Sequence, residues 1–184
     1  EERQRSSVYT TAETVLRAFA DPAVANSAMR SDVTAARLLD GRNHTLYVCA
    51  PSHEQGRLRP LFSALLGQLI SACYERAATR GRLDPPLLIV LDEAANIAPL
   101  RDLDQLASTA AGIGVQLVTV WQDLAQVRTR YGQRSDTVVN NHRAKLILSG
   151  ISDRDTLEYV SRLTGETEVT RENRSTSDDG QRTT

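Results

Sequence analysis

The sequence predicts an α/β fold, in which helices flank a mainly parallel sheet. From Thr45 onward, strand-forming runs alternate with helix-forming runs, which is the order that parallel sheets with crossover helices require. The run Leu87 to Leu91 is continuously aliphatic, as in a strand buried on both faces. A chain of 184 residues with 40% hydrophobic residues can fill the core of one ordinary domain.

Residues 1–44 are predicted to form a small helical region. Thr10 and Glu13 have the spacing of a capping box at a helix start. Asp21 and Pro22 fit the cap and first position of a second helix. A third, short helix is expected from Val33 to Leu39, before Gly41. No strand signal occurs before Thr45.

Residues 45–170 are predicted to carry the sheet and its helices, and residues 171–184 to be disordered. The tail is Ser, Thr, Asp, Asn and Arg with no apolar period. The predicted strands are Thr45–Cys49, Leu87–Leu91, Val115–Val120 and Ala144–Leu148. The predicted helices are Leu58–Cys73 ending before Gly81, Leu103–Ala110 closed by Gly112, Leu124–Arg130, and one capped by Asp153 that ends at Gly165.

Bulk composition gives no signature of a particular partner. The net charge of −1 offers no global attraction to nucleic acid or to a membrane. Cys49 and Cys73 lie in apolar contexts without metal-ligand spacing, which favours small core residues in a reducing compartment. His44, His53 and His142 share no metal-binding spacing. We find neither a signal peptide nor a membrane-length apolar run, so we expect this part to be soluble and any anchor to lie outside it.

Two adjacent acids, Asp92 and Glu93, follow the aliphatic run directly. Open α/β sheets bind ligands at the carboxyl ends of their strands. Two carboxylates there suit magnesium–nucleotide chemistry: Asp92 would hold the water shell of Mg²⁺, and Glu93 would orient an attacking water. This is a Walker B pattern. The alternative is a buried strand that is followed by solvated loop acids.

Gln122 follows the next predicted strand, Val115–Val120. An amide at that strand end could hydrogen-bond the γ-phosphate of a nucleotide or the attacking water, so the following helix would respond to nucleotide state. The alternative is a glutamine that merely precedes a helix.

The usual partner of a Walker B strand, a Walker A loop, is missing from these residues. No G-x-x-x-x-G-K-[ST] pattern occurs, and the single lysine, Lys145, has no glycine loop before it. Either the chain is part of an ATPase whose phosphate-binding loop precedes Glu1, or the acids have another role. We favour the first, and expect this chain alone to bind nucleotide feebly and to hydrolyse none.

In order and spacing, several motifs resemble the TraG/TraD coupling ATPases of conjugation and type IV secretion. The resemblance covers about Thr10 to Thr170. The matching motifs are Thr45–Pro51, the run LLIVLDEAANI, Gly112–Val115, Gln122, Tyr131-Gly132, Asn140-Asn141, Lys145–Gly150, Asp153, Thr156 and Gly165–Thr167.

The resemblance implies the C-terminal part of a RecA-like P-loop NTPase domain that works as a hexamer with ATP and Mg²⁺. Such a protein delivers DNA, or relaxase–DNA complexes, to a type IV secretion channel at the cytoplasmic face of a bacterial inner membrane. Its Walker A loop and membrane helices would precede Glu1, and residues 1–44 would end an all-α insertion. Asp92 matches the magnesium-binding acid, Glu93 the catalytic carboxylate and Gln122 the sensor.

One position departs from the family pattern. Members often carry a basic residue before the glycine that leads to the sensor strand, proposed to reach the nucleotide of a neighbouring subunit. Here residues 110–112 are Ala-Ala-Gly. An arginine acting between subunits must come from elsewhere, and Arg101, Arg128 and Arg143 are candidates. The alternative for each is a solvated surface arginine.

Several arginines and two aromatic residues are candidates for DNA contacts. Arg134, Arg143 and Arg154 could face DNA in the channel of a ring, where phosphate contacts are independent of base sequence. Trp121 and Tyr131 could stack on bases, although packing beside the sheet is the favoured interpretation.

Other functions remain open. The chain could be a non-catalytic module that docks a relaxosome protein, or part of another hexameric DNA translocase. If the phosphate-binding part of the domain is missing, sheet edges or apolar helix faces should be exposed. We then expect self-association or altered packing of the N-terminal helices.

Overall fold

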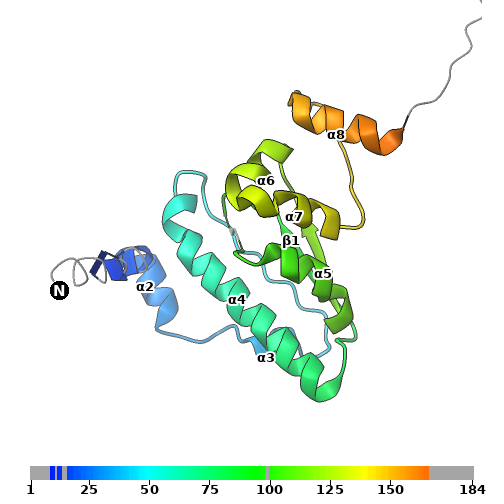
Figure 1. Ribbon diagram of the computed structural model, residues 1–184. Helices are drawn as coiled ribbons and strands as arrows, with labels where there is room; N and C mark the ends of the chain where they lie inside the picture. The colour runs from blue at the N-terminus through cyan, green and yellow to red at the C-terminus, as the bar shows by residue number, and fades with distance from the viewer. Residues whose placement is uncertain (1–8, 11, 14–15, 98–99, 166–184) are drawn as a thin grey trace, which may run out of the picture.

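A computed structural model describes residues 9–10, 12–13, 16–97 and 100–165, and the predicted tail 171–184 lies outside them. Its centre is a parallel pair of strands, β1 (Leu87–Leu91) and β2 (Val115–Thr119), joined through helix α5 (Leu103–Ile113) (Figure 1). The register runs from Leu87 opposite Val115 to Leu91 opposite Thr119. The mixed α/β class and the parallel pairing are confirmed, although the described chain is mostly helical.

Helices make up the remaining regular structure. The long helix α4 lies along the sheet, and α8 stands beside α6 at the far end of the molecule (Figure 1). The bounds of the other helical elements are η1 Arg17–Ala20, α2 Pro22–Ala28, α3 Ala35–Leu38, α4 Gln55–Arg80, α6 Leu124–Tyr131, η2 Gly132–Arg134, α7 Ser135–Asn141 and α8 Arg154–Thr164.

Most helix boundaries follow the predicted caps. Asp21 accepts a hydrogen bond from the Ala23 amide at the start of α2, and Asp153 caps α8 in the same way. Two predictions were wrong. Tyr9 is helical as well as Thr10, so Thr10 does not stand at a helix start. Helix α5 continues through Gly112 and ends at Gly114, whose φ of +83° provides the left-handed cap.

The predicted strands at Thr45–Cys49 and Ala144–Leu148 do not form within the described residues. A β-strand exists only where a neighbouring strand accepts and donates its backbone hydrogen bonds, and β1 and β2 pair only with each other here. Their side chains stay exposed, with Leu146 at 85%. Cys49 is exposed too, whereas Cys73 is a core residue as predicted.

The sheet is covered on one face only in the described structure. Ile89, Leu91 and Val115 point into the core, which is completed by side chains of α4 and α5 that include Cys73 and Leu106. Alternate residues point the other way. On that side the exposed apolar side chains form an open sheet face: Leu88 (55%), Val90 (56%), Val118 (45%) and Val120 (45%). Within the described residues, helices therefore cover one face of the sheet, and not both faces as the alternation of strands and helices had predicted. The exposed apolar surface is a sheet face, whereas a sheet edge or a helix face was expected.

A second core cluster joins α5, α6 and α7. It contains Leu103, Val127, Tyr131 and Val138, all of them buried. This cluster places α6, and hence the loop before it, at a defined position beside the end of β2.

Candidate functional site

The predicted site residues follow the carboxyl ends of the two paired strands. Asp92 and Glu93 come directly after β1, and Gln122 comes three residues after β2 ends. Pairing continues beyond the strands, because the Val120 N–H donates to the Leu91 carbonyl at 2.9 Å and the Ala94 N–H donates to the Val120 carbonyl at 3.2 Å. The acids and the segment that leads to Gln122 therefore leave the same edge of the sheet.

Glu93 has a left-handed backbone conformation, with φ of +48°, and it is the one non-glycine residue of the described chain with a positive φ. This conformation costs an L-residue roughly 1–2 kcal/mol. The turn supplies compensating bonds: the Glu93 N–H donates to Asp92 Oδ1 at 3.0 Å, and the Glu93 carbonyl accepts the Asn96 N–H at 2.8 Å. Backbone strain of this kind is concentrated at functional sites.

The two carboxylates differ in exposure. Asp92 is exposed, whereas Glu93 is half-buried and receives a long contact of 3.4 Å from Asn96 Nδ2 to its Oε2 atom. An exposed carboxylate can reach the water shell of a hydrated cation, and a partly enclosed one is better placed to hold a single water. Asn96 belongs to the run LLIVLDEAANI but was assigned no role from the sequence, because asparagines in loops are common.

Gln122 begins the turn that starts α6. Its N–H donates to Gln126 Oε1 at 3.1 Å, and Asp123 caps the helix by accepting the Gln126 N–H at 2.8 Å. The Gln122 side chain is exposed at the sheet edge. Because Gln122 directly precedes the capped helix, a contact made by its side chain would also affect the position of α6.

A hydrogen-bonded chain at the end of β2 was not predicted. Trp121 Nε1 donates to Thr119 Oγ1 at 2.8 Å, and Thr119 Oγ1 lies 3.2 Å from His142 Nε2. His142 Nδ1 lies 2.7 Å from the Val138 carbonyl, which can only accept, so in the neutral imidazole Nδ1 carries the proton and Nε2 accepts from Thr119. His142 lies 23 residues after Thr119, so the chain of side chains forms no recognisable sequence motif.

Trp121 and Tyr131 pack against each other, as predicted in preference to stacking on DNA bases. Their ring centroids are 6.0 Å apart at an interplanar angle of 74°, an edge-to-face contact. The Tyr131 hydroxyl donates to the Leu100 carbonyl at 3.0 Å, and burial raises the pKa of Tyr131 to about 12.

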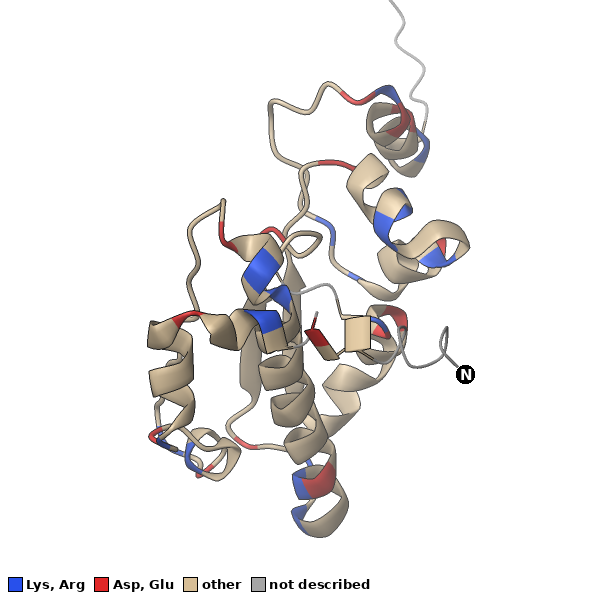
Figure 2. Cartoon of the chain, turned by 90° about the vertical axis from the view of Figure 1, so that its left-hand side faces the viewer, with Lys and Arg blue, Asp and Glu red and all other residues tan. Residues whose placement is uncertain are grey.

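The candidate arginines lie on exposed surface, and two of them are already paired with acids. Arg128 forms an ion pair with Asp155, and Arg134 contacts Asp104 at 3.2 Å. Basic and acidic residues are interspersed along the drawn helices (Figure 2). Arg101, Arg143 and Arg154 are exposed as well.

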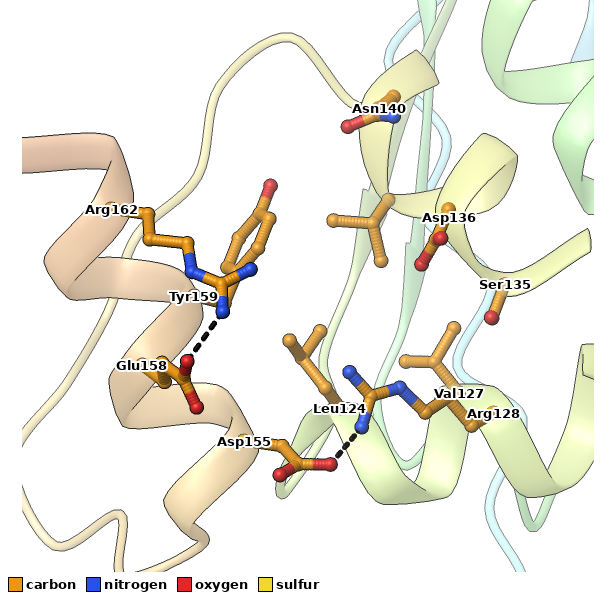
Figure 3. Close-up of a pocket in the computed structure, with 11 residues that line it drawn as sticks. Leu124, Val127, Arg128, Ser135, Asp136, Asn140, Asp155, Glu158, Tyr159 and Arg162 are labelled. Carbon is orange, nitrogen blue, oxygen red and sulfur yellow. Dashed lines mark hydrogen bonds and ion pairs between the residues drawn. The ribbon is translucent and has the colours of Figure 1, made fainter.

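Asp92, Glu93 and Gln122 line neither of two hollows in the surface, whereas the candidate arginines Arg128 and Arg101 line one each. One, of about 410 Å³, lies between α6, α7 and α8, where the Arg128–Asp155 and Arg162–Glu158 ion pairs line its wall (Figure 3). The other, of about 520 Å³, lies between α4 and α5 and includes Tyr74. Asp92, Glu93 and Gln122 instead lie on an open edge, where a further structural part could complete a site.

Comparison with known proteins identifies the family. The family described as "Type IV secretory system Conjugative DNA transfer" matches residues 1–184. The chain belongs to this family. The predicted likeness to TraG/TraD coupling proteins is thus confirmed.

Curated relatives agree with this assignment. A "Conjugal transfer protein TraG" of Escherichia coli is 28% identical over 191 residues, covering 99% of this chain and 29% of the relative. A protein of the same name from Rhizobium radiobacter is 35% identical over 119 residues, covering 63% of this chain and 18% of the relative. The chain thus spans less than a third of the length of these relatives. No solved structure matches.

The described residues contain neither a membrane-spanning helix nor a cluster of metal-binding side chains. Among them, no helix combines the length and the apolar character needed to cross a bilayer. The same residues contain no cluster of three or more His, Cys, Asp or Glu side chains that could enclose a metal ion.

Proposed function

We propose that this chain carries the Walker B and sensor elements of an ATP-driven DNA-translocating coupling protein. The supporting observation is the meeting of Asp92, Glu93 and the segment before Gln122 at one carboxyl edge of parallel strands. The Walker A loop comes from another part of a longer protein with a RecA-like domain. A chain that spans 29% of its E. coli relative leaves ample length for that part.

The residues present fit magnesium and a nucleotide. Mg²⁺ keeps several waters and takes one or two carboxylates together with phosphate oxygens, so an enclosing protein cage is not required. Bound Mg²⁺–ATP supplies the phosphoryl group that is transferred to water. Asp92 would hold the hydrated cation, Glu93 would hold and orient the water, and Gln122 would bond the γ-phosphate and so link nucleotide state to the position of α6.

The open sheet face supports a missing structural part. Leu88, Val90 and Val118 are half-exposed apolar side chains on a central strand pair, a surface that soluble domains normally cover. We propose that the phosphate-binding part of the longer protein packs there and offers strand partners to residues 45–49 and 144–148. In family terms the assembled protein is a hexamer at the inner membrane, with DNA, relaxosome proteins and the secretion channel as partners.

The test is DNA-stimulated ATP hydrolysis by the longer protein that contains this chain. Glu93→Gln should lower kcat at least about 100-fold, because it removes the group that orients and deprotonates water. Glu75→Gln, an exposed change on α4, is the matched control and should retain turnover. Full activity of the Glu93→Gln protein would overturn the proposal.

A second measurement separates the alternative functions. If the longer protein with an intact Walker A loop hydrolyses no ATP even with DNA, a non-catalytic role in docking relaxosome proteins gains support. This chain alone should show no turnover, and measurable hydrolysis that Glu93→Gln abolishes would contradict the need for a separate phosphate-binding part.

A further inference from the structure

The left-handed conformation of Glu93 requires a structural support, because an L-residue does not adopt it freely. The turn from Asp92 to Ile97 provides that support. The Glu93 carbonyl accepts two amides, from Asn96 at 2.8 Å and from Ile97 at 3.2 Å. The backbone of Glu93 is therefore fixed from the residues that follow it.

Asn96 is the residue of this turn that contacts Glu93 twice. Its backbone N–H bonds the Glu93 carbonyl at 2.8 Å, and its side-chain Nδ2 lies 3.4 Å from Glu93 Oε2. The side-chain distance is long, so the backbone hydrogen bond contributes most of the stabilisation of the turn. The side-chain amide of Asn96 sets the direction of the Glu93 carboxylate. An amide nitrogen can only donate, which suits an ionised carboxylate.

Arg59 connects this turn to α4. Its Nε donates to the Asn96 carbonyl at 2.8 Å, across 37 residues of sequence, and its side chain is half-buried. Because the Arg59 guanidinium bonds a neutral carbonyl, it stabilises the turn through Asn96 and leaves the Glu93 carboxylate available for its proposed role. Arg59 of α4 thus holds Asn96 in place by a hydrogen bond, and Asn96 in turn contacts Glu93.

We propose that Asn96 is a positioning residue for Glu93 and that Arg59 anchors Asn96 in place. The inference rests on the proposed function, since it assigns the support of the carboxylate named there. With Oε2 contacted by the Asn96 side-chain amide, Oε1 would be the oxygen that holds the water. Asn96 therefore acts on the rate of hydrolysis and leaves nucleotide affinity to other groups.

Steady-state kinetics of the longer protein give the first test. Asn96→Ala should lower kcat about 10-fold and leave the KM for ATP within about 2-fold, since partners that orient a reacting group typically contribute 10- to 100-fold. The matched control is Asn26→Ala, an exposed asparagine on α2. The double variant Glu93→Gln/Asn96→Ala should be no slower than Glu93→Gln alone, because Asn96 acts through Glu93.

A conservative change gives a test that a merely structural role would not pass. Asn96→Asp keeps the shape of the side chain but replaces the donating amide with an acceptor. The contact from Asn96 Nδ2 to Glu93 Oε2 is then lost, so kcat should fall at least as far as in Asn96→Ala, while the KM for ATP stays within about 2-fold.

The outcomes distinguish a failure of the positioning role from a failure of the proposed function. If Glu93→Gln is inactive but Asn96→Ala matches Asn26→Ala, the positioning role is overturned and the proposed function stands. If Glu93→Gln keeps full turnover, the proposed function fails, and the positioning role fails with it. If Asn96→Ala does not fold, Asn96→Asp decides, and a kcat equal to that of Asn26→Ala overturns the inference.

Discussion

Replacing Thr156 by valine would test how α8 is attached to the start of α6. Thr156 is a buried polar residue, and its Oγ1 accepts the Leu124 N–H at 3.0 Å while donating to Asp153 Oδ2 at 2.7 Å. Leu124 is the first residue of α6, two positions after Gln122. Valine has nearly the same shape as threonine, so the change removes both hydrogen bonds with little loss of packing.

The expected cost follows from the amide that loses its acceptor. An unsatisfied donor costs about 1–3 kcal/mol, and the lower end applies because Leu124 is only half-buried and water can replace the hydroxyl. Since 1.4 kcal/mol corresponds to a factor of ten, we expect opening at this contact to become about 5- to 10-fold more frequent. The effect should be local, because Thr156 lies outside both core clusters.

Hydrogen exchange of this chain measures the effect directly. The Leu124 amide and the first turn of α8 should exchange about 5- to 10-fold faster in Thr156→Val, whereas β1 should be unchanged. Thr129→Val, an exposed change on α6, is the control. Unchanged exchange at Leu124 in the Thr156→Val chain would refute the attachment as described.

The same contact predicts a dependence on pH. Hydrogen bonds from the hydroxyl and then the amide of Thr156 lower the pKa of Asp153 in the folded chain. A carboxyl group with a lowered folded pKa stabilises the structure fully above the ordinary aspartate pKa of about 3.9. That contribution is lost as pH falls through the folded value. Docking of α8 should therefore weaken in acid, and less so in Thr156→Val.

Three further predictions concern the core, the thiols and the open sheet face. Gly114→Ala should destabilise the chain by at least about 1 kcal/mol in urea unfolding, because φ is +83° and the added methyl group would lie 2.6 Å from the backbone oxygen of Leu83. Gly112→Ala should be neutral or stabilising, because Gly112 lies within α5 and its added methyl group would lie in open space. Burial raises the pKa of Cys73 to about 11, so a thiol reagent at neutral pH should modify exposed Cys49 and spare Cys73 until unfolding, and equal rates would contradict the packing. This chain alone should self-associate in sedimentation, and Val90→Lys on the open sheet face should reduce the association. A purely monomeric chain at high concentration would contradict self-association through this face.

Local patterns predicted the parts of the structure that depend on neighbouring residues. The aliphatic run of β1, the cap Asp21 and the cap Asp153 each act within a few residues, and each was predicted correctly. The location of Asp92 and Glu93 at the end of a parallel strand followed from the same local signal.

Contacts between distant segments could not be predicted in this way. Arg59 reaches Asn96 over 37 residues, and Thr119 reaches His142 over 23, so neither pair forms a pattern in the sequence. The helix end at Gly114 was missed because Gly112 offered the same local signal two residues earlier. The choice between them depends on the loop before β1, whose Leu83 packs against Gly114.

The two unpaired runs show how strand formation depends on a partner. Residues 45–49 and 144–148 have the β-branched and aliphatic side chains that favour strands, yet among the described residues neither has a neighbouring strand to complete its hydrogen bonds. Backbone pairing and coverage of the open sheet face are coupled, because a strand added at an edge also extends the surface on which helices pack. A structural part that supplies one missing strand would therefore stabilise several segments at once. The free energy of unfolding of this chain alone should accordingly understate the stability of the edge that carries Asp92, Glu93 and Gln122.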